Sequence, residues 1–418
     1  MQNSAQQVNS GFYGLGIAPS LLDILAKLGY RTPTPIQRQA IPIAMQGKDV
    51  VGIAQTGTGK TLAFGIPMIQ LLAHTKGRGL VLLPTRELAL QVDEQLRKVG
   101  HSIGLRTAVL IGGLSIQAQI QAIAKNPHVI IATPGRLNDH LNQKTVNLSK
   151  VNILVLDEAD RMLDMGFLPQ IQKILHFVPK ERQTMLFSAT ISAEVMRIAT
   201  ANMKLPLRVE VSPSGTTVES VAQEIFVLRK EAKNRLLEKI LSEYQGSVLV
   251  FTRTKFGAKR VTKAVRDMGH SVAEIHSNRS LAQRRDALGG FKTGKYRVLV
   301  ATDIAARGID VIGIELVINY DFPMHPEDYV HRIGRTGRAG AEGRAISFVL
   351  PEEQRNMRGI ERLIRKNLRI SPLPELPPQR ISDPLAHAQP RQQYRYPYGQ
   401  ARQPRSFRPR NHRGRRRG

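Results

Sequence analysis

Short apolar runs recur along most of the chain, and helical patterns lie between them. Each run is nearly continuous rather than alternating, which is typical of a strand buried on both faces. The segment after Pro84 is spaced for one face of a helix, formed by Leu88, Val92, Leu96 and Val99. Strands that alternate with helices predict a parallel α/β sheet. The runs of the first half are residues 49–54, 80–83, 129–132, 153–156 and 185–187.

The rhythm breaks at residues 205–220, where Pro213, Ser214 and Gly215 indicate a linker. A second series of apolar runs then follows at residues 225–228, 248–251, 298–301, 316–318 and 345–349. We therefore predict two α/β domains of ordinary size, residues 1–211 and 221–370, joined by a linker at 212–220.

The composition changes again after Ile370. A Pro-rich stretch leads into residues 384–418, which hold ten arginines, no Asp or Glu, and the aromatic residues Tyr394, Tyr396, Tyr398 and Phe407. Such a segment buries too little apolar surface to fold alone, so we predict that residues 371–418 form a disordered basic tail. Arginines and tyrosines suit sequence-tolerant RNA binding, although a tail that only confers solubility is the alternative.

Charge and composition limit the classes of function that the chain can have. The chain has 61 Lys and Arg against 33 Asp and Glu, a net charge of +28, which predicts attraction to polyanions, with nucleic acid ahead of anionic membranes. The absence of cysteine excludes disulfides, thiolate metal sites and a cysteine nucleophile. No apolar run is long enough to span a bilayer, and the polar start lacks a secretory pattern. We expect a cytoplasmic protein with no membrane partner.

A glycine-rich segment, residues 54–61, follows a predicted strand and precedes a predicted helix. Glycines let the backbone turn its N–H groups toward phosphate oxygens, Lys60 can reach the β- and γ-phosphates, and the Thr61 hydroxyl can bind Mg²⁺. The strict phosphate-loop pattern begins with Gly, whereas this chain has Ala54. A plain glycine-rich turn is the alternative, which the strand–loop–helix context disfavours.

Carboxylates end the apolar run at residues 153–156. Asp157 fits the acidic group that a phosphate-loop nucleotidase uses to hold Mg²⁺, and Glu158 could polarise the attacking water. A solvated acidic turn is the alternative, and we favour the metal interpretation because the phosphate loop lies upstream.

Two further groups come from the second half. Arg332, Arg335 and Arg338 recur at a spacing of three, which would place them on one side if the segment is helical. An arginine from a second domain can stabilise the charge that builds on a γ-phosphate. By itself this pattern fits a solvated or nucleic-acid-binding basic helix equally well. Asp310 offers a carboxylate to a ribose hydroxyl, a signal that is weak alone.

Taken together, these motifs resemble the DEAD-box RNA helicases of superfamily 2 over residues 12–350. In chain order the matching segments are residues 29–37 with Phe12 upstream, 54–61, 84–88, 112–113, 133–136, 157–160, 188–190, 249–253, 301–310 and 331–338. Residues 161–167 are similar to those of the bacterial RhlE-like subgroup.

The resemblance implies two tandem RecA-like domains with ATP and Mg²⁺ bound between them. The implied ATP-binding residues are Tyr30, Gln37, Ala54, Gln55, Thr56, Gly57, Thr58, Gly59, Lys60, Thr61 and Asp310, with Tyr30 and Gln37 reading the adenine. The implied catalytic residues are Lys60, Asp157, Glu158, Arg335 and Arg338, and the metal ligands are Thr61 and Asp157. Asp160, Ser188 and Thr190 are implied to couple the nucleotide state to domain closure.

RNA is the implied partner, within ribosomal or RNA-decay assemblies, and its contacts are expected mostly at phosphate and sugar. The implied RNA-binding residues are Pro84, Thr85, Arg86, Gly113, Thr133, Pro134, Gly135, Arg136, Arg253, Arg284 and Thr302. One departure concerns the Gln that the family often has three residues before the arginine matching Arg284, because this chain has Leu281 there.

The activity expected from the resemblance is local unwinding of short RNA duplexes, or remodelling of RNA–protein complexes, coupled to ATP hydrolysis. Three rivals remain at this point: a DNA helicase or translocase, a non-enzymatic RNA clamp, and an unrelated phosphate-loop nucleotidase with a basic tail. Whether RNA or DNA stimulates ATP hydrolysis distinguishes an RNA helicase from the first rival. Glu158 with both predicted arginine fingers argues against the second, and residues 29–37 with 331–338 argue against the third.

Overall fold

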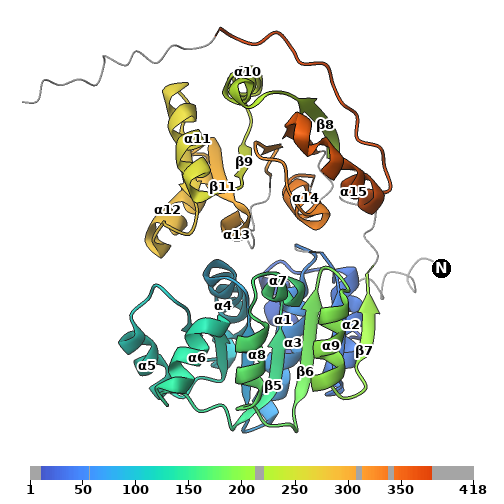
Figure 1. Cartoon of the computed structure of the whole chain (residues 1–418). Helices are drawn as coiled ribbons and strands as arrows, with labels where there is room; N and C mark the ends of the chain where they lie inside the picture. Colours follow the sequence, from blue (N-terminus) through green and yellow to red (C-terminus); the bar gives the residue numbers. More distant parts are fainter. Residues whose placement is uncertain (1–10, 56, 212–220, 307–312, 338–342, 379–418) are drawn as a thin grey trace, which may run out of the picture. The chain divides into compact units, whose positions relative to one another are not determined.

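The computed structural model describes residues 11–378, except residues 56, 212–220, 307–312 and 338–342 (Figure 1). The predicted linker at 212–220 and nearly all of the predicted tail therefore lie outside the described residues. Within the described ranges, no helix is both long and apolar enough to cross a bilayer. The described chain forms two parallel sheets, one in each predicted domain.

The first domain contains a seven-stranded parallel sheet in the order β3-β4-β2-β5-β6-β1-β7. Its strands are β1 (Val50–Ile53), β2 (Arg78–Leu82), β3 (Thr107–Leu110), β4 (Val129–Ala132), β5 (Val151–Leu156), β6 (Gln183–Ser188) and β7 (Leu207–Glu210). Its helices are α1 (Pro19–Lys27), α2 (Pro35–Met45), α3 (Lys60–His74), α4 (Arg86–Gly100), α5 (Ile116–Ala124), α6 (Pro134–Asn142), α7 (Ala159–Asp164), α8 (Leu168–Leu175) and α9 (Ala193–Asn202).

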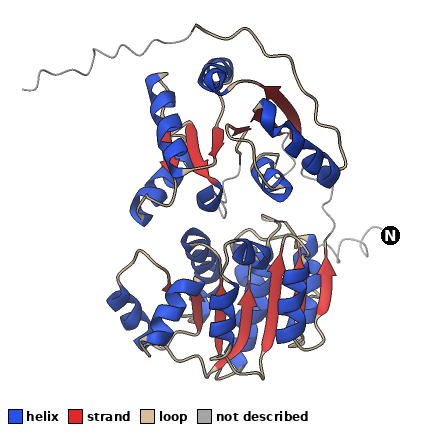
Figure 2. Ribbon diagram, in the orientation of Figure 1, coloured by secondary structure: helices blue, strands red, loops and turns tan. Residues whose placement is uncertain are grey.

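Helices cover both faces of this sheet, so its central strands are buried on both sides (Figure 2). Alternate residues of β5 belong to two separate apolar cores: Ile153 and Val155 pack in the core with α1 to α4, and Leu154 and Leu156 pack in the core with α6 to α9. This explains why the strands read as continuous apolar runs rather than as alternating patterns. The predicted helix after Pro84 is α4.

The second domain contains a six-stranded parallel sheet in the order β10-β11-β9-β12-β13-β8. Its strands are β8 (Val221–Val227), β9 (Val248–Thr252), β10 (Val272–Ile275), β11 (Val298–Thr302), β12 (Leu316–Asn319) and β13 (Gly343–Val349). Its helices are α10 (Lys233–Glu243), α11 (Lys255–Asp267), α12 (Leu281–Lys292), α13 (Asp303–Ala306), α14 (Pro326–Ile333) and α15 (Gln354–Ile364). The predicted fold class, two RecA-like α/β domains, is confirmed.

Two details differ from the expectation. The pattern assigned residues 205–220 to a break, yet residues 207–210 form β7 and pair with β1. One residue of β7, Val209, is buried, so this edge strand lacks an apolar run that would announce it. In addition, α14 ends at Ile333, so Arg332 and Arg335 do not share a helical face. Gly334 follows directly, and the chain there leaves the helix.

Candidate functional site

The carboxyl ends of parallel strands meet at one edge of a sheet, and in the first domain this edge carries the predicted motifs. The phosphate loop follows β1, the acidic segment follows β5, and Ser188 ends β6. These are three adjacent strands, in the order β5-β6-β1. The three motifs that were predicted to bind and hydrolyse ATP are therefore neighbours in space, although more than a hundred residues of chain separate the first from the last.

The phosphate loop has the backbone that its glycines predict. Gly57 and Gly59 have φ angles of +88° and +89°, in the left-handed region that glycine adopts without strain. The buried Lys60 begins α3, and its Nζ donates to the Ala54 carbonyl oxygen at 3.0 Å. An ammonium group has three protons, so Lys60 closes the loop and retains donors for a phosphate. Thr56 lies outside the described residues.

Gln37 connects the segment at 29–37 to the phosphate loop. Its Oε1 accepts from the Thr34 N–H at 2.9 Å within the cap of α2, and its Nε2 donates to the Gly59 carbonyl oxygen at 2.9 Å. A side-chain amide has two donor hydrogens and two acceptor lone pairs, so one of each is left. That pair is complementary to the N7 acceptor and amino donor of an adenine. Tyr30 is half-buried beside the core that contains α2.

Two buried carboxylates after β5 differ in their electrostatic surroundings. Burial raises the pKa of Asp157 to about 6, against the opposing effect of the Lys60 ammonium. Burial also acts to raise the pKa of Glu158, but the Arg161 guanidinium and Lys60 outweigh it and hold that pKa below its ordinary value. Glu158 is paired with Arg161 one helical turn away and is therefore a carboxylate. Sequence reasoning missed Arg161, although its spacing of three from Glu158 was a usable signal.

Glu158 also has an unusual backbone. Its φ of +53° and ψ of +50° place it in the left-handed region, where a non-glycine residue is uncommon. Glu158 immediately precedes α7, and its N–H donates to Asp157 Oδ1 at 2.9 Å. Such strained positions are maintained by surrounding structure and concentrate at functional sites. The turn sets the directions of two successive carboxylates at the end of β5.

Asp160 joins the acidic segment to the end of β6. Its Oδ2 accepts hydrogen bonds from the Ala189 N–H, the Thr190 N–H and the Thr190 hydroxyl at 3.0, 3.0 and 3.1 Å. The Ser188 hydroxyl donates to the Thr190 carbonyl oxygen at 2.8 Å. Burial opposes ionisation of Asp160, yet Lys60 and the Arg161 N–H prevail and lower its pKa. The predicted coupling residues are thus in direct contact.

The predicted RNA-binding residues of the first domain lie at the other half of the same sheet edge. Residues 84–86 follow β2, Gly113 follows β3 and residues 133–136 follow β4, and these strands are adjacent in the order β3-β4-β2. The Arg86 guanidinium lies so close to Gly112 and Gly113 that a Cβ at either glycine would collide with it. Arg136 donates to the Leu114 carbonyl oxygen at 3.1 Å. The predicted nucleotide-binding and RNA-binding motifs therefore divide one edge into two contiguous halves.

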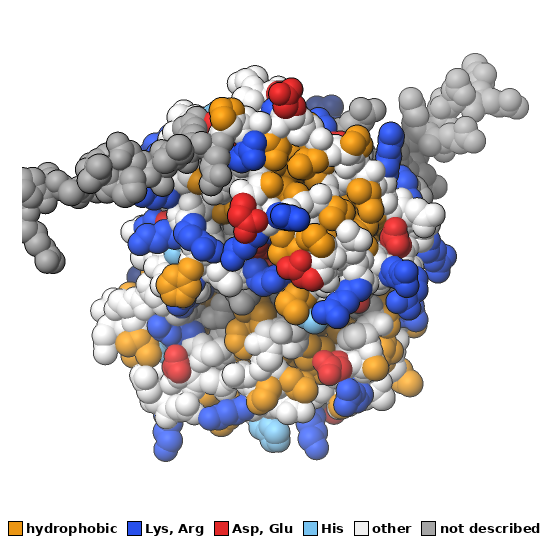
Figure 3. Space-filling model, turned by 45° about the horizontal axis from the view of Figure 1, so that its top comes forward, with side chains coloured by type: hydrophobic (Ala, Val, Ile, Leu, Met, Phe, Trp, Pro, Cys, Tyr) orange, Lys and Arg blue, Asp and Glu red, His pale blue; other side chains and the backbone are white. Residues whose placement is uncertain are grey.

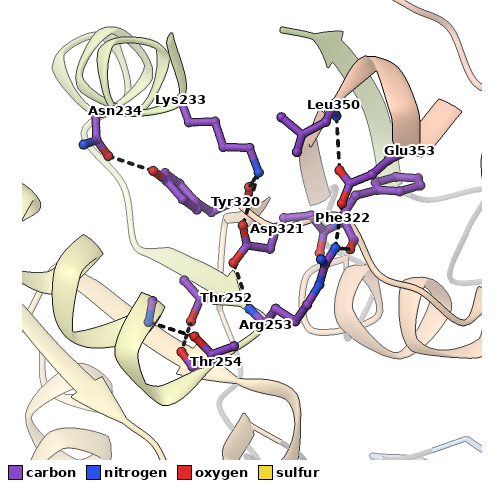
Figure 4. Close-up of polar contacts among 12 residues, drawn as sticks. Lys233, Asn234, Thr252, Arg253, Thr254, Tyr320, Asp321, Phe322, Leu350 and Glu353 are labelled. Carbon is purple, nitrogen blue, oxygen red and sulfur yellow. Dashed lines mark hydrogen bonds and ion pairs between the residues drawn. The ribbon is translucent and has the colours of Figure 1, made fainter. Parts of the chain in front are cut away.

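In the second domain, a polar network holds Arg253 where it follows β9 (Figure 4). The Arg253 N–H donates to Asp321 Oδ2 at 2.9 Å, and its guanidinium donates to Glu353 Oε1 at 2.6 Å and to the Phe322 carbonyl oxygen at 3.1 Å. Asp321 Oδ1 accepts from the buried Lys233 at 3.1 Å. Sequence reasoning missed Asp321, Glu353 and Lys233, because no motif brings these separate segments together.

The arginines near α14 have different surroundings. Arg332 is buried, pairs with both carboxylate oxygens of Asp303 at 2.6 and 2.8 Å, and lies 5.1 Å from the centre of the Phe251 ring. It is a structural residue of the second domain. Arg335 is also buried, and its Nε donates to the His331 carbonyl oxygen at 3.3 Å. Arg338 and Asp310 lie outside the described residues.

The remaining predicted residues have clear places. Thr302 ends β11, next to β9 in the sheet. Arg284 lies in the first turn of α12, where Ser280 caps the helix and Leu281 is the first helical residue. The RNA-binding candidates of the second domain therefore come from one end of its sheet, β10-β11-β9.

Comparisons with known proteins agree with this architecture. The family description "DEAD/DEAH box helicase" matches residues 34–198, and "Helicase conserved C-terminal domain" matches residues 232–340. The chain is 44% identical to an ATP-dependent rRNA helicase, rrp3, from Sclerotinia sclerotiorum over 349 residues, which cover 82% of this chain and 72% of the relative. It is 43% identical to the DEAD-box ATP-dependent RNA helicase CshA from Bacillus cereus over 360 residues, 85% of this chain and 68% of the relative.

A solved structure of Dbp5 from S. cerevisiae, bound to RNA and ADP BeF3, is also similar. It matches with a TM-score of 0.76 and 31% identity, covering 84% of this chain and 93% of that one. The two sheets and their motif-bearing edges thus define a superfamily 2 helicase core. The chain belongs to the DEAD-box ATP-dependent RNA helicases. It is an ATP-hydrolysing RNA helicase, as this membership establishes.

Proposed function

We propose that this helicase binds RNA without sequence specificity across both domains, 1–211 and 221–370, and that ATP-driven closure of the domains strains a short duplex locally. The observation that carries the proposal is the division of the first sheet's edge, with nucleotide motifs after β5-β6-β1 and RNA motifs after β3-β4-β2. Two ligands that share one rigid edge, and that both need the second domain, favour the same closed state. Each should therefore tighten the binding of the other.

The proposed roles follow from the contacts. Lys60 orients the β- and γ-phosphates from the closed phosphate loop, and Gln37 presents its spare donor and acceptor to adenine. Glu158, held ionised by Arg161, accepts the proton of the attacking water. We assign Arg335, Arg338 and Asp310 to the side of the nucleotide supplied by the second domain. The Asp160–Thr190 contact links the acidic segment to β6.

Mg²⁺ is part of the proposal. Among the described residues, no three His, Cys, Asp or Glu side chains gather into a metal site. Nucleotide-bound Mg²⁺ needs one or two protein oxygens beside phosphates and water, and the Thr61 hydroxyl and Asp157 carboxylate match that donor set. Burial raises the pKa of Asp157, and a bound cation would offset this by stabilising the ionised carboxylate. When bound, Mg²⁺ would neutralise charge that develops on the phosphates.

Three finer assignments complete the proposal. Residues 161–167 support membership of the RhlE-like subgroup. The rRNA helicase name of one relative supports ribosomal or RNA-decay assemblies as partners. A chain without cysteine needs no oxidising compartment, which supports action in the cytoplasm.

ATP hydrolysis measured with single-stranded RNA, single-stranded DNA and a short RNA duplex tests the proposal. We expect stimulation by either RNA and much less by DNA, because 2′-hydroxyl contacts distinguish the two polymers. Lys60→Ala is the control and should remove turnover in every arm. Equal stimulation by DNA, or no stimulation by any polymer, would refute it.

A further inference from the structure

A second basic surface lies in the second domain, on residues that belong to none of the motifs discussed above. An open cavity of about 620 Å³ is lined by Arg358, Glu361, Arg362, Arg365, Lys366 and Asn367, at the carboxyl end of α15. Four of these six side chains are cationic and one is acidic. We refer to this cavity lining as the α15 basic surface. Basic side chains are also spread over the face drawn in Figure 3, among few acidic ones.

Among the described residues, the cations of the α15 basic surface outnumber its one carboxylate four to one. Its single carboxylate, Glu361, accepts a hydrogen bond from the Leu368 N–H at 3.0 Å and so serves to close the chain after the helix. Within the described part of the chain, none of the four cations pairs with a carboxylate. Arg362 donates to the Arg358 carbonyl oxygen of its own helix, at 3.2 Å. Like charges four residues apart repel and destabilise a helix.

The opposite face of α15 fixes this surface in place. Met357 and Ile360 are buried with Tyr329 and Ile333 of α14, which lies beside α15 in Figure 1. Just beyond the helix, Ile370 forms a parallel bridge with Ile225 of β8. The arginines therefore project from a helix anchored on both sides. A rigid scaffold reduces the entropy lost when the cations engage a ligand.

The position within the sheet separates this surface from the RNA motifs. Arg253, Arg284 and Thr302 belong to the β10-β11-β9 end. Arg253 contacts Glu353, the residue just before α15. The α15 basic surface begins farther along the helix, at Arg358, and the chain after it continues to Ile370, which pairs with β8. β9 and β8 are three strand spacings apart, about 14 Å at the usual interval. The α15 basic surface thus lies farther along α15 than the Arg253 contact, toward the β8 edge, and one RNA chain is long enough to reach both.

The chemistry of the surface favours phosphodiester oxygens. Guanidinium groups form paired hydrogen bonds to phosphate, and three of the four cations are arginines. A protein partner would need an apolar centre, and none of the six residues that line this cavity is apolar. We propose that the α15 basic surface binds backbone phosphates of RNA, in the segment next to the one that the predicted RNA-binding residues hold. The inference rests on the proposed RNA binding and adds a second contact region to it.

The test compares two triple variants of the full chain that remove equal charge from the same domain. The first is Arg358→Gln, Arg362→Gln and Lys366→Gln. The matched control is Lys259→Gln, Lys263→Gln and Arg266→Gln on α11, three exposed cations at similar helical spacing. Affinity is measured against salt for an RNA of about ten nucleotides, which fits the site size of single-strand binders, and for one about three times longer.

We expect the α15 triple to weaken binding of the long RNA roughly tenfold and to lower its salt slope by about 2, since each lost phosphate contact removes about 0.7. Binding of the short RNA should change no more than it does in the α11 control. Equal losses in both triples would show a general charge effect and overturn the site. An unchanged long-RNA slope would overturn it as well. Failure of the proposed function is distinguishable, because wild-type ATPase would then ignore RNA altogether.

Discussion

At the scale of single residues, the pairing of Glu158 with Arg161 makes a sharp prediction. Glu158→Gln keeps the shape and the left-handed turn but cannot accept a proton, so turnover should fall at least about a hundredfold, the usual size of a general-base contribution. ATP binding should persist because Lys60 and its loop are untouched. Single-turnover hydrolysis and nucleotide binding measure the two effects. The control is Glu94→Gln, which removes an exposed partner of Lys98 and should leave turnover unchanged. Normal turnover by the Glu158 variant would show that Glu158 is not the general base.

Asp321 makes a prediction about stability rather than chemistry. Asp321→Ala leaves the Lys233 ammonium buried without its counter-charge, which we expect to cost about 2 kcal/mol of unfolding free energy, less than a fully buried pair because Asp321 is a quarter exposed. The Asp286→Ala control breaks an exposed pair with Lys295 and should cost under about 0.5 kcal/mol. Urea denaturation of both variants measures the difference, and similar costs would contradict the network in Figure 4.

At the scale of elements, alanine substitutions of one glycine in β1 and one in α12 should change the free energy of unfolding in opposite directions. A Cβ at Gly52 would lie 2.5 Å from the Phe187 ring, so Gly52→Ala should destabilise the first domain by about 1–3 kcal/mol. Gly289 in α12 has open space around its Cβ position and a helical backbone, so Gly289→Ala should stabilise by about 0.5–1 kcal/mol. Chemical denaturation gives both signs, and a neutral Gly52→Ala would mean that the strand has room to move.

Elements also show how far sequence reasoning reaches. The central strands were predictable because helices cover both faces and every position prefers an apolar side chain. The three strands with no predicted run, β3, β7 and β10, are all edge strands. Each pairs on one side only. Its apolar pattern is interrupted by half-buried positions in β3 and β10 and by exposed positions in β7. The helix end at Ile333 was not predicted either. The spacing of three residues between the arginines does not show where a helix ends, and Gly334 was the one local signal for it.

The candidate site was predictable where a motif is local and not where it is assembled. The phosphate loop and the acidic segment each lie within one short stretch, and the parallel sheet brings their strands together. The Arg253 network instead draws on four separate segments, which contribute Lys233, Arg253, Asp321 and Glu353. Arg332 shows the converse, because a motif arginine proved to be an internal partner of Asp303. Side-chain direction was the missing information in both cases.

At the scale of the whole molecule, charge makes the prediction. Residues 384–418 contribute ten of the positive charges, and we predict that they add sequence-tolerant RNA affinity. Deleting this segment should lower the salt slope of RNA binding by several units while ATP hydrolysis at saturating RNA persists. A deletion of the same segment carrying the α15 triple should lower it further, because the two contact regions differ. An unchanged slope after deletion would leave the segment a role in solubility alone.

The double burial of β5 has a consequence for how this protein can change over generations. Neighbouring positions of the strand pack in different cores. A polar side chain at Ile153, Leu154, Val155 or Leu156 would therefore be buried in an apolar core on either face of the sheet. Inherited variation should be scarce there and accumulate instead on outward turns such as those of α5, where most side chains meet solvent. The geometry of the acidic segment is thus protected, because the strand that precedes it tolerates polar substitutions on neither face.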